Sequence, residues 1–347
     1  MNTKTLTRNA FLLAVLAVPL LPFAGDYLLH VLTLIMVYMV LAMGLNIVPG
    51  FCGMLDLGFV GFYGVGAYTC GLLTMNYELS LWLILPIAAL NGAAWGILRG
   101  APTLRLTGDY FAIVTFGFSE LVVLFLTNEI WLTRGPLGLP GIAPAAIDLS
   151  WLSKALNPEW DWYWEFIGEK PYYYMAFLLV LGVFFMMRRI EDSRIGRAWF
   201  AIREDDLAAA SAGIDVQVYK VIAYAVSAAI GAVAGSFLAR WTMFLSPDMF
   251  KFWESFLVLC MIVLGGLGNM TGALLGSVVL IALGELLREV LPRLGMPAET
   301  RFIVYGLIMV LIMRFKPSGF LPKIADAALQ NPIILELRRT LKAKGVA

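Results

Sequence analysis

Charge, histidine and cysteine are scarce in this sequence. Only 14% of its 347 residues are charged and 61% are hydrophobic, whereas soluble domains have roughly 25% charged and 45–50% apolar residues. The single histidine, His30, excludes a histidine-based metal cluster, and the cysteines, Cys52, Cys70 and Cys260, form no CxxC pair. Lys+Arg 25 against Asp+Glu 24 leaves a net charge of +1, so no basic field indicates a nucleic-acid partner. The composition is that of a polytopic membrane protein.

Sequence motifs for independent catalysis are also missing. No G-x-x-x-x-G-K-[ST] occurs, so the chain has no P-loop of its own for ATP, and neither HExxH nor GxSxG is present. Residues 64–69 depart from GxGxxG at the last position and lie within an apolar run. We therefore expect no catalytic residue, no metal ligand and no cofactor bound by this chain, which argues against an enzyme.

Ten apolar runs predict transmembrane helices. A helix that crosses the bilayer needs about 20 mainly apolar residues, and the shorter runs are predicted as half-helices or re-entrant segments. The runs are 10–24, 28–48, 55–75, 81–98, 110–126, 172–187, 218–239, 255–269, 271–287 and 302–315. The predicted fold class is all-α: a polytopic membrane protein with about ten transmembrane helices, some of them broken or re-entrant.

The distribution of lysine and arginine predicts the orientation of these spans. Basic residues gather before the first span, in 99–109, in 188–217 and in the tail from Pro322, and ten spans place these four segments on one side. That side is the cytoplasm by the positive-inside rule. Both termini are therefore predicted to be cytoplasmic, in a multi-pass protein of the membrane.

The same reading divides the chain into segments. Residues 1–27 form an N-terminal segment with an uncleaved first helix, 28–321 the main membrane domain with a cytoplasmic loop at 188–217, and 322–347 a basic cytoplasmic tail. On the opposite side, four charges around the end of the seventh span are expected to pair in solvent. They are Arg240, Asp248, Lys251 and Glu254.

Glycine is concentrated in residues 44–71, where eight glycines accompany polar side chains. A uniform lipid-facing helix is implausible there, because broken helices at membrane depth occur where they line a cavity or are buried in protein. A substrate path and a polar packing interface both fit this stretch, and the path is the favoured interpretation. Its candidates are Asn46, Asp56, Tyr63 and Tyr68.

Other glycines recur at intervals of four residues. They are Gly92, Gly96 and Gly100; Gly231 and Gly235; and Gly268, Gly272 and Gly276. This spacing puts small residues on one face of a helix and lets two backbones approach closely in lipid. We predict a role in helix packing for these three sets.

Glu120 is the one charged residue near the middle of a predicted span. A carboxylate at that depth costs about 2.5–3.5 kcal/mol on insertion scales, so it should face protein or a water-filled cavity. It could meet the ammonium group of a substrate or a wetted path. A structural hydrogen bond or a contact with a partner chain fits equally well.

The cytoplasmic loop 188–217 carries the pattern of a short amphipathic helix from Ala198 to Ala212. Apolar residues form one surface and Arg203 to Asp206 the charged part, while Gly213 is well placed as a C-terminal cap. The helix is predicted either to lie solvated at the interface or to dock into another protein, and docking is favoured.

Four segments together resemble one family. They are GLNIVPGFCGMLDLGFVGFYGVGAYT at 44–69, LRLTGDYFAIVTFGFSELV at 104–122, RIGRAWFAIREDDLAAASAGI at 194–214 and SFLVLCMIVLGGLGNMTGALLG at 255–276. FKPSGFLP at 315–322 adds a similar exit from the last helix. In this order, over about residues 40–322, the chain resembles the LivM-type permease subunits of high-affinity ABC importers for branched-chain amino acids.

The resemblance implies an assembly in the bacterial cytoplasmic (inner) membrane. Its other members are a related LivH-type permease, two cytoplasmic ATPases that bind ATP and Mg²⁺, and a periplasmic substrate-binding protein. Residues 28–321 would form the permease domain and half of the translocation path. The loop 188–217 resembles the coupling loop that such permeases insert into their ATPases.

The coupling motif of these loops is commonly EAA followed three residues later by Gly. Here Leu207-Ala208-Ala209 precedes Gly213, so leucine stands at the glutamate position and the acid falls at Asp206. Because of this departure, the contacts of individual side chains with an ATPase are more doubtful than the docking of the loop itself. The coupling residues implied by the resemblance are Arg194, Gly196, Arg197, Arg203, Glu204, Asp205, Ala208, Ala209 and Gly213.

Two other functions stay open at this point. Permeases of urea or short-chain amides are similar in the same segments. An ion-coupled secondary transporter would also have broken helices and buried carboxylates, and it would transport without ATPases.

Overall fold

The computed structural model describes residues 19, 25–103, 108–148, 163–316 and 319–321. The predicted span 10–24, apart from Pro19, and the predicted tail 322–347 lie outside these residues. Each of the other nine predicted spans overlaps a helix. These helices are α2 (Asp26–Leu45), α3 (Val60–Tyr77), α4 (Leu81–Thr103), α5 (Asp109–Asn128), α8 (Glu169–Glu191), α11 (Val216–Thr242), α12 (Phe252–Gly265), α13 (Met270–Arg293) and α14 (Arg301–Phe315).

The predicted helical class is confirmed, and so is the expectation that some spans are short. Six helical segments in the described part of the chain are long and apolar enough to cross a bilayer: 26–51, 81–102, 110–128, 169–191, 216–242 and 270–293. In contrast, α12 has 14 residues and α14 has 15, fewer than the 20 or so that a perpendicular span requires.

Small elements join the long helices at their ends. β1 (Leu139–Pro140) pairs antiparallel with β4 (Phe244–Leu245), and β2 (Ala146–Asp148) pairs with β3 (Tyr163–Glu165). Near these strands lie α6 (Ile130–Thr133) and single 3₁₀ turns at Gly135–Leu137 and Pro247–Phe250, and another 3₁₀ turn, Ala298–Thr300, precedes α14. The chain between α8 and α11 forms α9 (Arg194–Glu204) and α10 (Asp206–Ser211).

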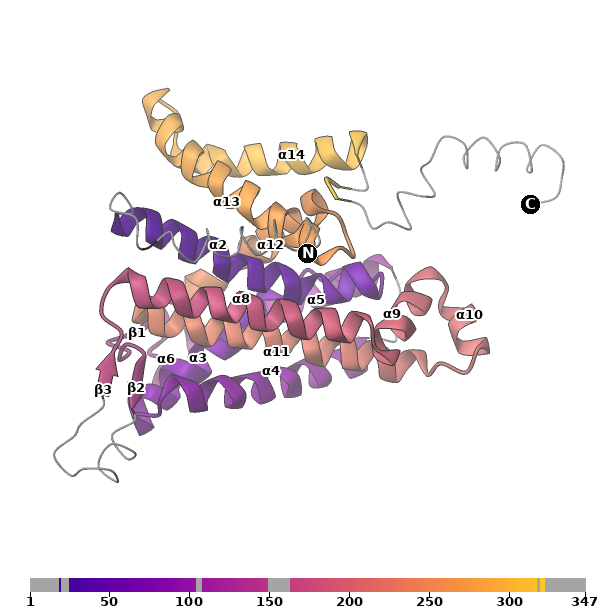
Figure 1. Ribbon diagram of the computed structural model, residues 1–347, viewed down its shortest axis with the longest axis horizontal. Helices are drawn as coiled ribbons and strands as arrows, with labels where there is room; N and C mark the ends of the chain where they lie inside the picture. Colours follow the sequence, from indigo (N-terminus) through magenta and orange to yellow (C-terminus); the bar gives the residue numbers. More distant parts are fainter. Residues whose placement is uncertain (1–18, 20–24, 104–107, 149–162, 317–318, 322–347) are drawn as a thin grey trace, which may run out of the picture.

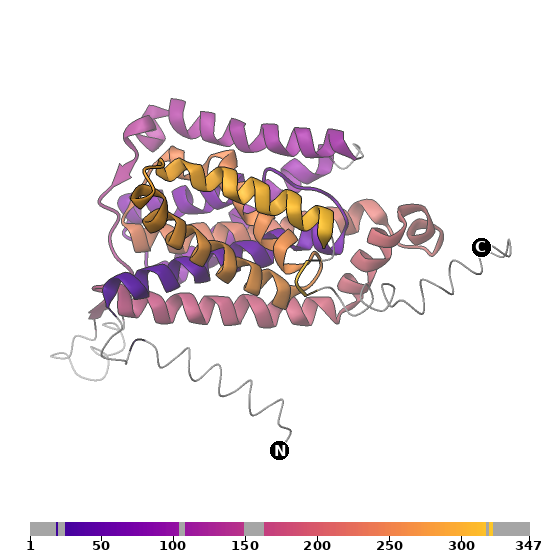
Figure 2. The same ribbon diagram turned by 90° about the horizontal axis from the view of Figure 1, so that it is seen from above.

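The long helices run side by side, with the strands at one end of the bundle and α9 and α10 at the other (Figure 1). We call these the sheet end and the α9–α10 end. The view from above shows α5 along one side of the bundle and α8 along the opposite side (Figure 2), while α13 and α14 lie at the top of the bundle in Figure 1. The sequence did not predict the two short sheets, which pair β1 with β4 and β2 with β3 at the sheet end.

Small residues hold the helices in close contact, as their spacing predicts, although the prediction was wrong for Gly268, which precedes α13 and has φ +80°. A Cβ added at Gly96 of α4 would lie 2.8 Å from the Cβ of Ala228 in α11, and one at Gly92 would lie 2.5 Å from the Cβ of Ala232. Gly272 at the start of α13 faces the backbone of Gly265 in α12 in the same way. Because neither backbone could approach with larger side chains, these glycines set the helix spacing.

Candidate functional site

The segment between α8 and α11 forms two helices, not the single helix predicted from Ala198 to Ala212. Asp205 is extended (φ −162°, ψ 116°), and its carboxylate accepts hydrogen bonds from the backbone N–H groups of Leu207 (2.8 Å) and Ala208 (3.0 Å). This is an N-cap, which satisfies backbone donors that a helix start leaves free. Asp205 therefore ends α9 and begins α10.

The prediction that Gly213 caps the helix is confirmed. Gly213 has φ +85°, and its N–H donates to the carbonyl of Ala210 at 3.0 Å. The next N–H, of Ile214, donates to the carbonyl of Ala209 at 3.1 Å. This pair of bonds is a Schellman motif, which requires the left-handed backbone that glycine adopts without strain.

The tip of this two-helix segment points away from the bundle (Figure 1). Glu204, Asp205, Asp206 and Ala208 are exposed, and Leu207 is 83% exposed, whereas Ala209 is buried. Beside the tip, a cleft of about 660 Å³ lies between α9–α10 and residues 52–55. An exposed leucine and alanine flanked by carboxylates form a surface that another protein could cover.

Two side chains of α9 anchor the segment to the bundle. The indole N–H of Trp199, which is fully buried, donates to the carbonyl of Tyr219 at 2.8 Å. The guanidinium of Arg203 donates from Nη1 to the carbonyl of Gly50 at 2.7 Å, so this predicted coupling residue faces the bundle. The sequence does not single out Trp199, whose one signal is a large aromatic on the apolar face of an amphipathic helix.

The corner between α8 and α9 is tight at Gly196. Ser193 caps α9 by accepting from the N–H groups of Ile195 (3.1 Å) and Gly196 (3.4 Å). A Cβ at Gly196 would overlap the carbonyl oxygens of Ile190 and Glu191 at the end of α8. Nearby Arg197 donates to the carbonyl of Asp192 at 2.8 Å. Arg194, the first residue of α9, is exposed on the same corner.

The predicted break within 44–71 is confirmed, and Arg203 contacts it. After α2, residues Ile47–Phe51 form a π-helical turn, followed by an irregular stretch up to α3. Asn46 is fully buried, and its Oδ1 accepts from the N–H of Gly268 at 3.0 Å. Phe51 packs edge-on against Phe200 of α9, with ring centroids 4.9 Å apart. The break is therefore joined directly to α9.

Asp56 lies in this irregular stretch and forms a buried ion pair with Arg99 of α4. Arg99 Nη2 lies 2.5 Å from Asp56 Oδ2, and the two side chains are 2% and 0% exposed. The other carboxylate oxygen accepts from the N–H of Gly58 (2.8 Å), and Arg99 Nη1 donates to the carbonyl of Gly58 (3.0 Å). Reading Arg99 as a charge of the loop 99–109 was wrong, since α4 continues to Thr103 and carries it inside.

Tyr63 and Tyr68 of α3 share a neighbour rather than facing each other across a cavity. Both rings meet Phe250 in edge-to-face contacts, with centroid distances of 5.3 Å for Tyr63 and 6.0 Å for Tyr68. Both side chains are buried, and the hydroxyl of Tyr68 has no hydrogen-bond partner among the described residues. These contacts do not test the predicted path role of either tyrosine.

Glu120 lies exposed on α5, among exposed apolar side chains that include Phe116, Leu121 and Leu124. No hydrogen bond or ion pair joins its carboxylate to the part of the chain that the structure describes. The sequence predicts that Glu120 faces protein or water. In the described part of the chain no protein group covers it, and its role stays a prediction.

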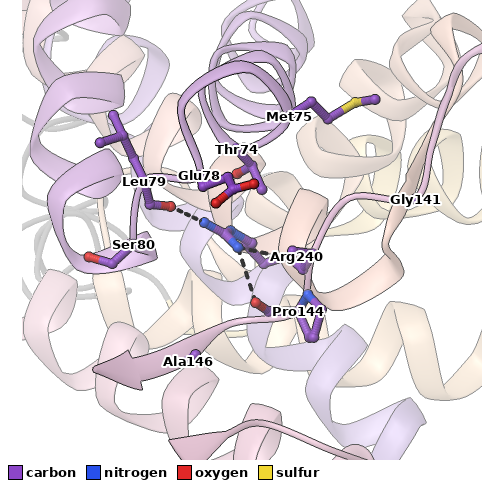
Figure 3. A pocket seen from close by; sticks show the side chains of 10 residues that line it. Thr74, Met75, Glu78, Leu79, Ser80, Gly141, Pro144, Ala146 and Arg240 are labelled. Atoms are coloured by element: carbon purple, nitrogen blue, oxygen red, sulfur yellow. Dashed lines mark hydrogen bonds between the residues drawn. The ribbon is translucent and has the colours of Figure 1, made fainter. Parts of the chain in front are cut away.

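Arg240 closes a cavity of about 530 Å³ at the sheet end (Figure 3). The sequence predicts Arg240 in solvent, but this was wrong, because the residue is only 4% exposed. Nη1 donates to the carbonyls of Ala143 (2.9 Å) and Pro144 (3.0 Å), and Nη2 donates to the carbonyl of Leu79. Arg240 thus joins three segments of this end. Of the four charges expected in solvent, Lys251 and Asp248 do pair there, at 2.7 Å.

Comparison with known proteins decides the family. The family model described as branched-chain amino acid transport system / permease component matches residues 27–313. The chain belongs to this permease family. It is 39% identical over 332 residues to the high-affinity branched-chain amino acid transport system permease protein LivM of Escherichia coli. The match covers 92% of this chain and 76% of that protein.

More distant members of the permease family are also similar. A probable branched-chain amino acid transport permease protein LivM of Methanocaldococcus jannaschii is 26% identical over 251 residues, 70% of this chain and 68% of that protein. The high-affinity branched-chain amino acid transport system permease protein LivH of Salmonella typhimurium is 25% identical over 302 residues. The match covers 82% of this chain and 91% of that protein. No solved structure matches the chain.

Proposed function

We propose that this permease is the LivM-type subunit of a high-affinity ABC importer for leucine, isoleucine and valine. Family membership carries this proposal, and the anchored α9–α10 segment supports it. A related LivH-type permease would complete the translocation path, two cytoplasmic ATPases would bind ATP and Mg²⁺, and a periplasmic protein would deliver the substrate. The chain itself would bind no cofactor and catalyse no reaction.

The proposed orientation places the α9–α10 end in the cytoplasm of a bacterium and the sheet end in the periplasm. Ten spans in the inner membrane, with 1–27 contributing the first, would leave both termini and the tail 322–347 in the cytoplasm. The permease domain is then 28–321, with its coupling loop at 188–217. The basic loop arginines support this orientation through the positive-inside rule.

Coupling would follow from the way α9 is attached. ATP-driven closure of the ATPases would move α9 and α10 as a body, an example of rigid-body transmission between domains. Arg203 and Trp199 would pass this motion to the π-helical turn and to the start of α11, because they bond to the carbonyls of Gly50 and Tyr219. Alternating access would then result from shifts around the break between α2 and α3.

Glu120 supports the place of α5 in this assembly. A carboxylate exposed to lipid near the membrane centre would cost about 2.5–3.5 kcal/mol, so the face of α5 that carries it is proposed to meet the partner permease or a water-filled path between the two. The ammonium group of a passing amino acid is one counter-charge that such a path would supply.

Replacing Glu120 by Gln tests its role in transport. If the carboxylate attracts a substrate ammonium, we expect Glu120→Gln to lower the uptake rate or raise the KM several-fold in proteoliposomes, at unchanged permease content. Gln keeps the size of Glu and one acceptor oxygen, and it removes the charge. Unchanged affinity and rate would leave Glu120 a structural contact with the partner chain.

Reconstitution tests the whole function. Proteoliposomes that contain both permeases and both ATPases should accumulate radiolabelled leucine only when ATP and the binding protein are supplied. Excess unlabelled isoleucine and valine should compete, and urea or acetamide should not. Uptake by this chain alone in an ion gradient would identify a secondary transporter, and competition by urea would identify an amide permease; either result contradicts the proposal.

A further inference from the structure

A small cavity between α2, α12, α13 and α14 is lined by charges of both signs. It has a volume of about 190 Å³. Its lining includes Glu254 and Arg301, the first residue of α14. A second lining carboxylate, Glu285, already accepts from the hydroxyl of Tyr27 (3.0 Å) and lies 3.7 Å from Arg288. Neither Glu254 nor Arg301 belongs to the break or the α9–α10 segment, and the sequence predicts Glu254 in solvent. α12 and α14 begin, and α13 ends, at the sheet end (Figure 1).

The carboxylate of Glu254 retains capacity for a ligand. The hydroxyl of Tyr38 in α2 donates to Glu254 Oε2 at 2.5 Å, which holds the carboxylate in place. A carboxylate can accept about four hydrogen bonds, and this one bond uses a single oxygen. The remaining acceptor positions suit a group with several donors, such as an ammonium.

Arg301 and Trp253 each have a donor without an acceptor among the described residues. No carboxylate among the described residues lies within ion-pair distance of Arg301, and the guanidinium instead lies 5.0 Å from the ring centroid of Phe302. Its Nε and the indole Nε1 of Trp253 are buried and have no hydrogen-bond partner in the described part of the chain. Buried donors are normally satisfied, so these two donors indicate an acceptor that is supplied from outside.

We infer that this cavity binds a free α-amino acid as a zwitterion, with its ammonium at Glu254 and its carboxylate at Arg301 and Trp253. Leu34, Leu257 and Ile281 line the rest of the cavity and would contact an aliphatic side chain. The volume equals that of about six water molecules at ~30 Å³ each and is below the ~300–1,000 Å³ of sites for drug-sized ligands. The choice of leucine as ligand rests on the proposed function; the requirement for both charges does not.

Binding of leucine and its two half-charged analogues to the assembled complex tests the inference. The permease–ATPase complex in nanodiscs, without the binding protein, is titrated with L-leucine, 4-methylpentanoate and L-leucinamide by saturation-transfer difference NMR. Leucine should bind at least tenfold more tightly than either analogue. Arg301→Gln should weaken leucine at least tenfold and leave leucinamide unchanged, and Glu254→Gln should weaken leucine and leave 4-methylpentanoate unchanged.

Matched variants control for loss of structure. Arg293→Gln and Glu289→Gln make the same exchanges on exposed residues of α13 outside the cavity wall and should bind leucine like the wild type. Leu34→Phe fills the cavity without changing charge and should abolish binding. Basal ATPase activity and a monodisperse complex establish that each variant is folded.

The overturning results are distinct from a failure of the proposed function. Equal leucine affinity in the wild type, Glu254→Gln and Arg301→Gln, or retained binding in Leu34→Phe, overturns the site. The site is also overturned if the wild-type complex imports leucine with ATP and the binding protein but shows no saturable leucine signal without the binding protein. In that last case the import function stands and only this cavity loses its role.

Discussion

Neutralising either member of the Asp56–Arg99 pair should destabilise the permease by about 3–5 kcal/mol, because the remaining charge would be buried without a partner. Asp56→Asn keeps an acceptor for the N–H of Gly58 and removes the charge together with the acceptor that faces Arg99. Arg99→Met keeps most of the length of the side chain. Since Arg99 also packs over the ring of Phe62 (4.3 Å) and that of Tyr224 (4.8 Å), its loss should have the larger effect.

A double-mutant cycle separates the charge effect from packing. We expect Asp56→Asn/Arg99→Met to be less destabilised than the sum of the single variants, by about 0.5–3 kcal/mol, as is typical for residues in contact. The midpoint of heat-induced unfolding in detergent is the measurement. Asp248→Asn breaks a pair whose side chains are 58% and 76% exposed and should change stability by less than about 1 kcal/mol. Strictly additive single effects would show that the pair contributes no coupling.

The helices follow from the sequence because the bilayer imposes their length and polarity. Nine of the ten predicted runs coincide with helices, and the short runs near 255–269 and 302–315 do form short helices. The break within 44–71 also follows from local composition, because Pro49 and the neighbouring glycines disfavour one continuous helix. These features depend on residues close together in the chain.

The buried charges could not be predicted in this way. Arg99 lies 43 residues from Asp56, and the carbonyl of Leu79 that Arg240 binds lies 161 residues from it. Hydropathy treats both arginines, and Glu254, as ends of spans in water. Only the packing of distant segments places a partner beside each, so a charge near the end of a span is ambiguous until the tertiary contacts are known.

The break between α9 and α10 did have a local signal. The alanine-rich pattern of 198–212 fits one helix, but Asp205 is among the strongest N-cap residues and precedes another good start, Asp206. The chain breaks there because the carboxylate of Asp205 satisfies two backbone donors at the start of α10. In contrast, the bond from Arg203 to Gly50 joins residues 153 positions apart and has no local signal.

Gly196→Val and Ala208→Arg should each uncouple ATP hydrolysis from uptake, through different ends of the same segment. Valine at Gly196 would overlap the carbonyls of Ile190 and Glu191, so the corner between α8 and α9 would have to open and α9 could no longer move with α8. Arginine at Ala208 would place a long charged side chain on the exposed tip proposed to enter the ATPase. We expect leucine uptake per ATP hydrolysed to fall at least tenfold in both, with normal amounts of permease in the membrane.

Matched substitutions make the result specific to coupling. Gly182→Val introduces the same side chain into α8 at a position where nothing lies within 4 Å of the added Cβ, and Ala208→Ser changes the tip without adding bulk. Both should transport like the wild type in proteoliposomes that contain the full complex. Normal coupled uptake in Gly196→Val and in Ala208→Arg would contradict a coupling role for this segment, because no rigid link between ATPase and bundle would then pass through α9 and α10.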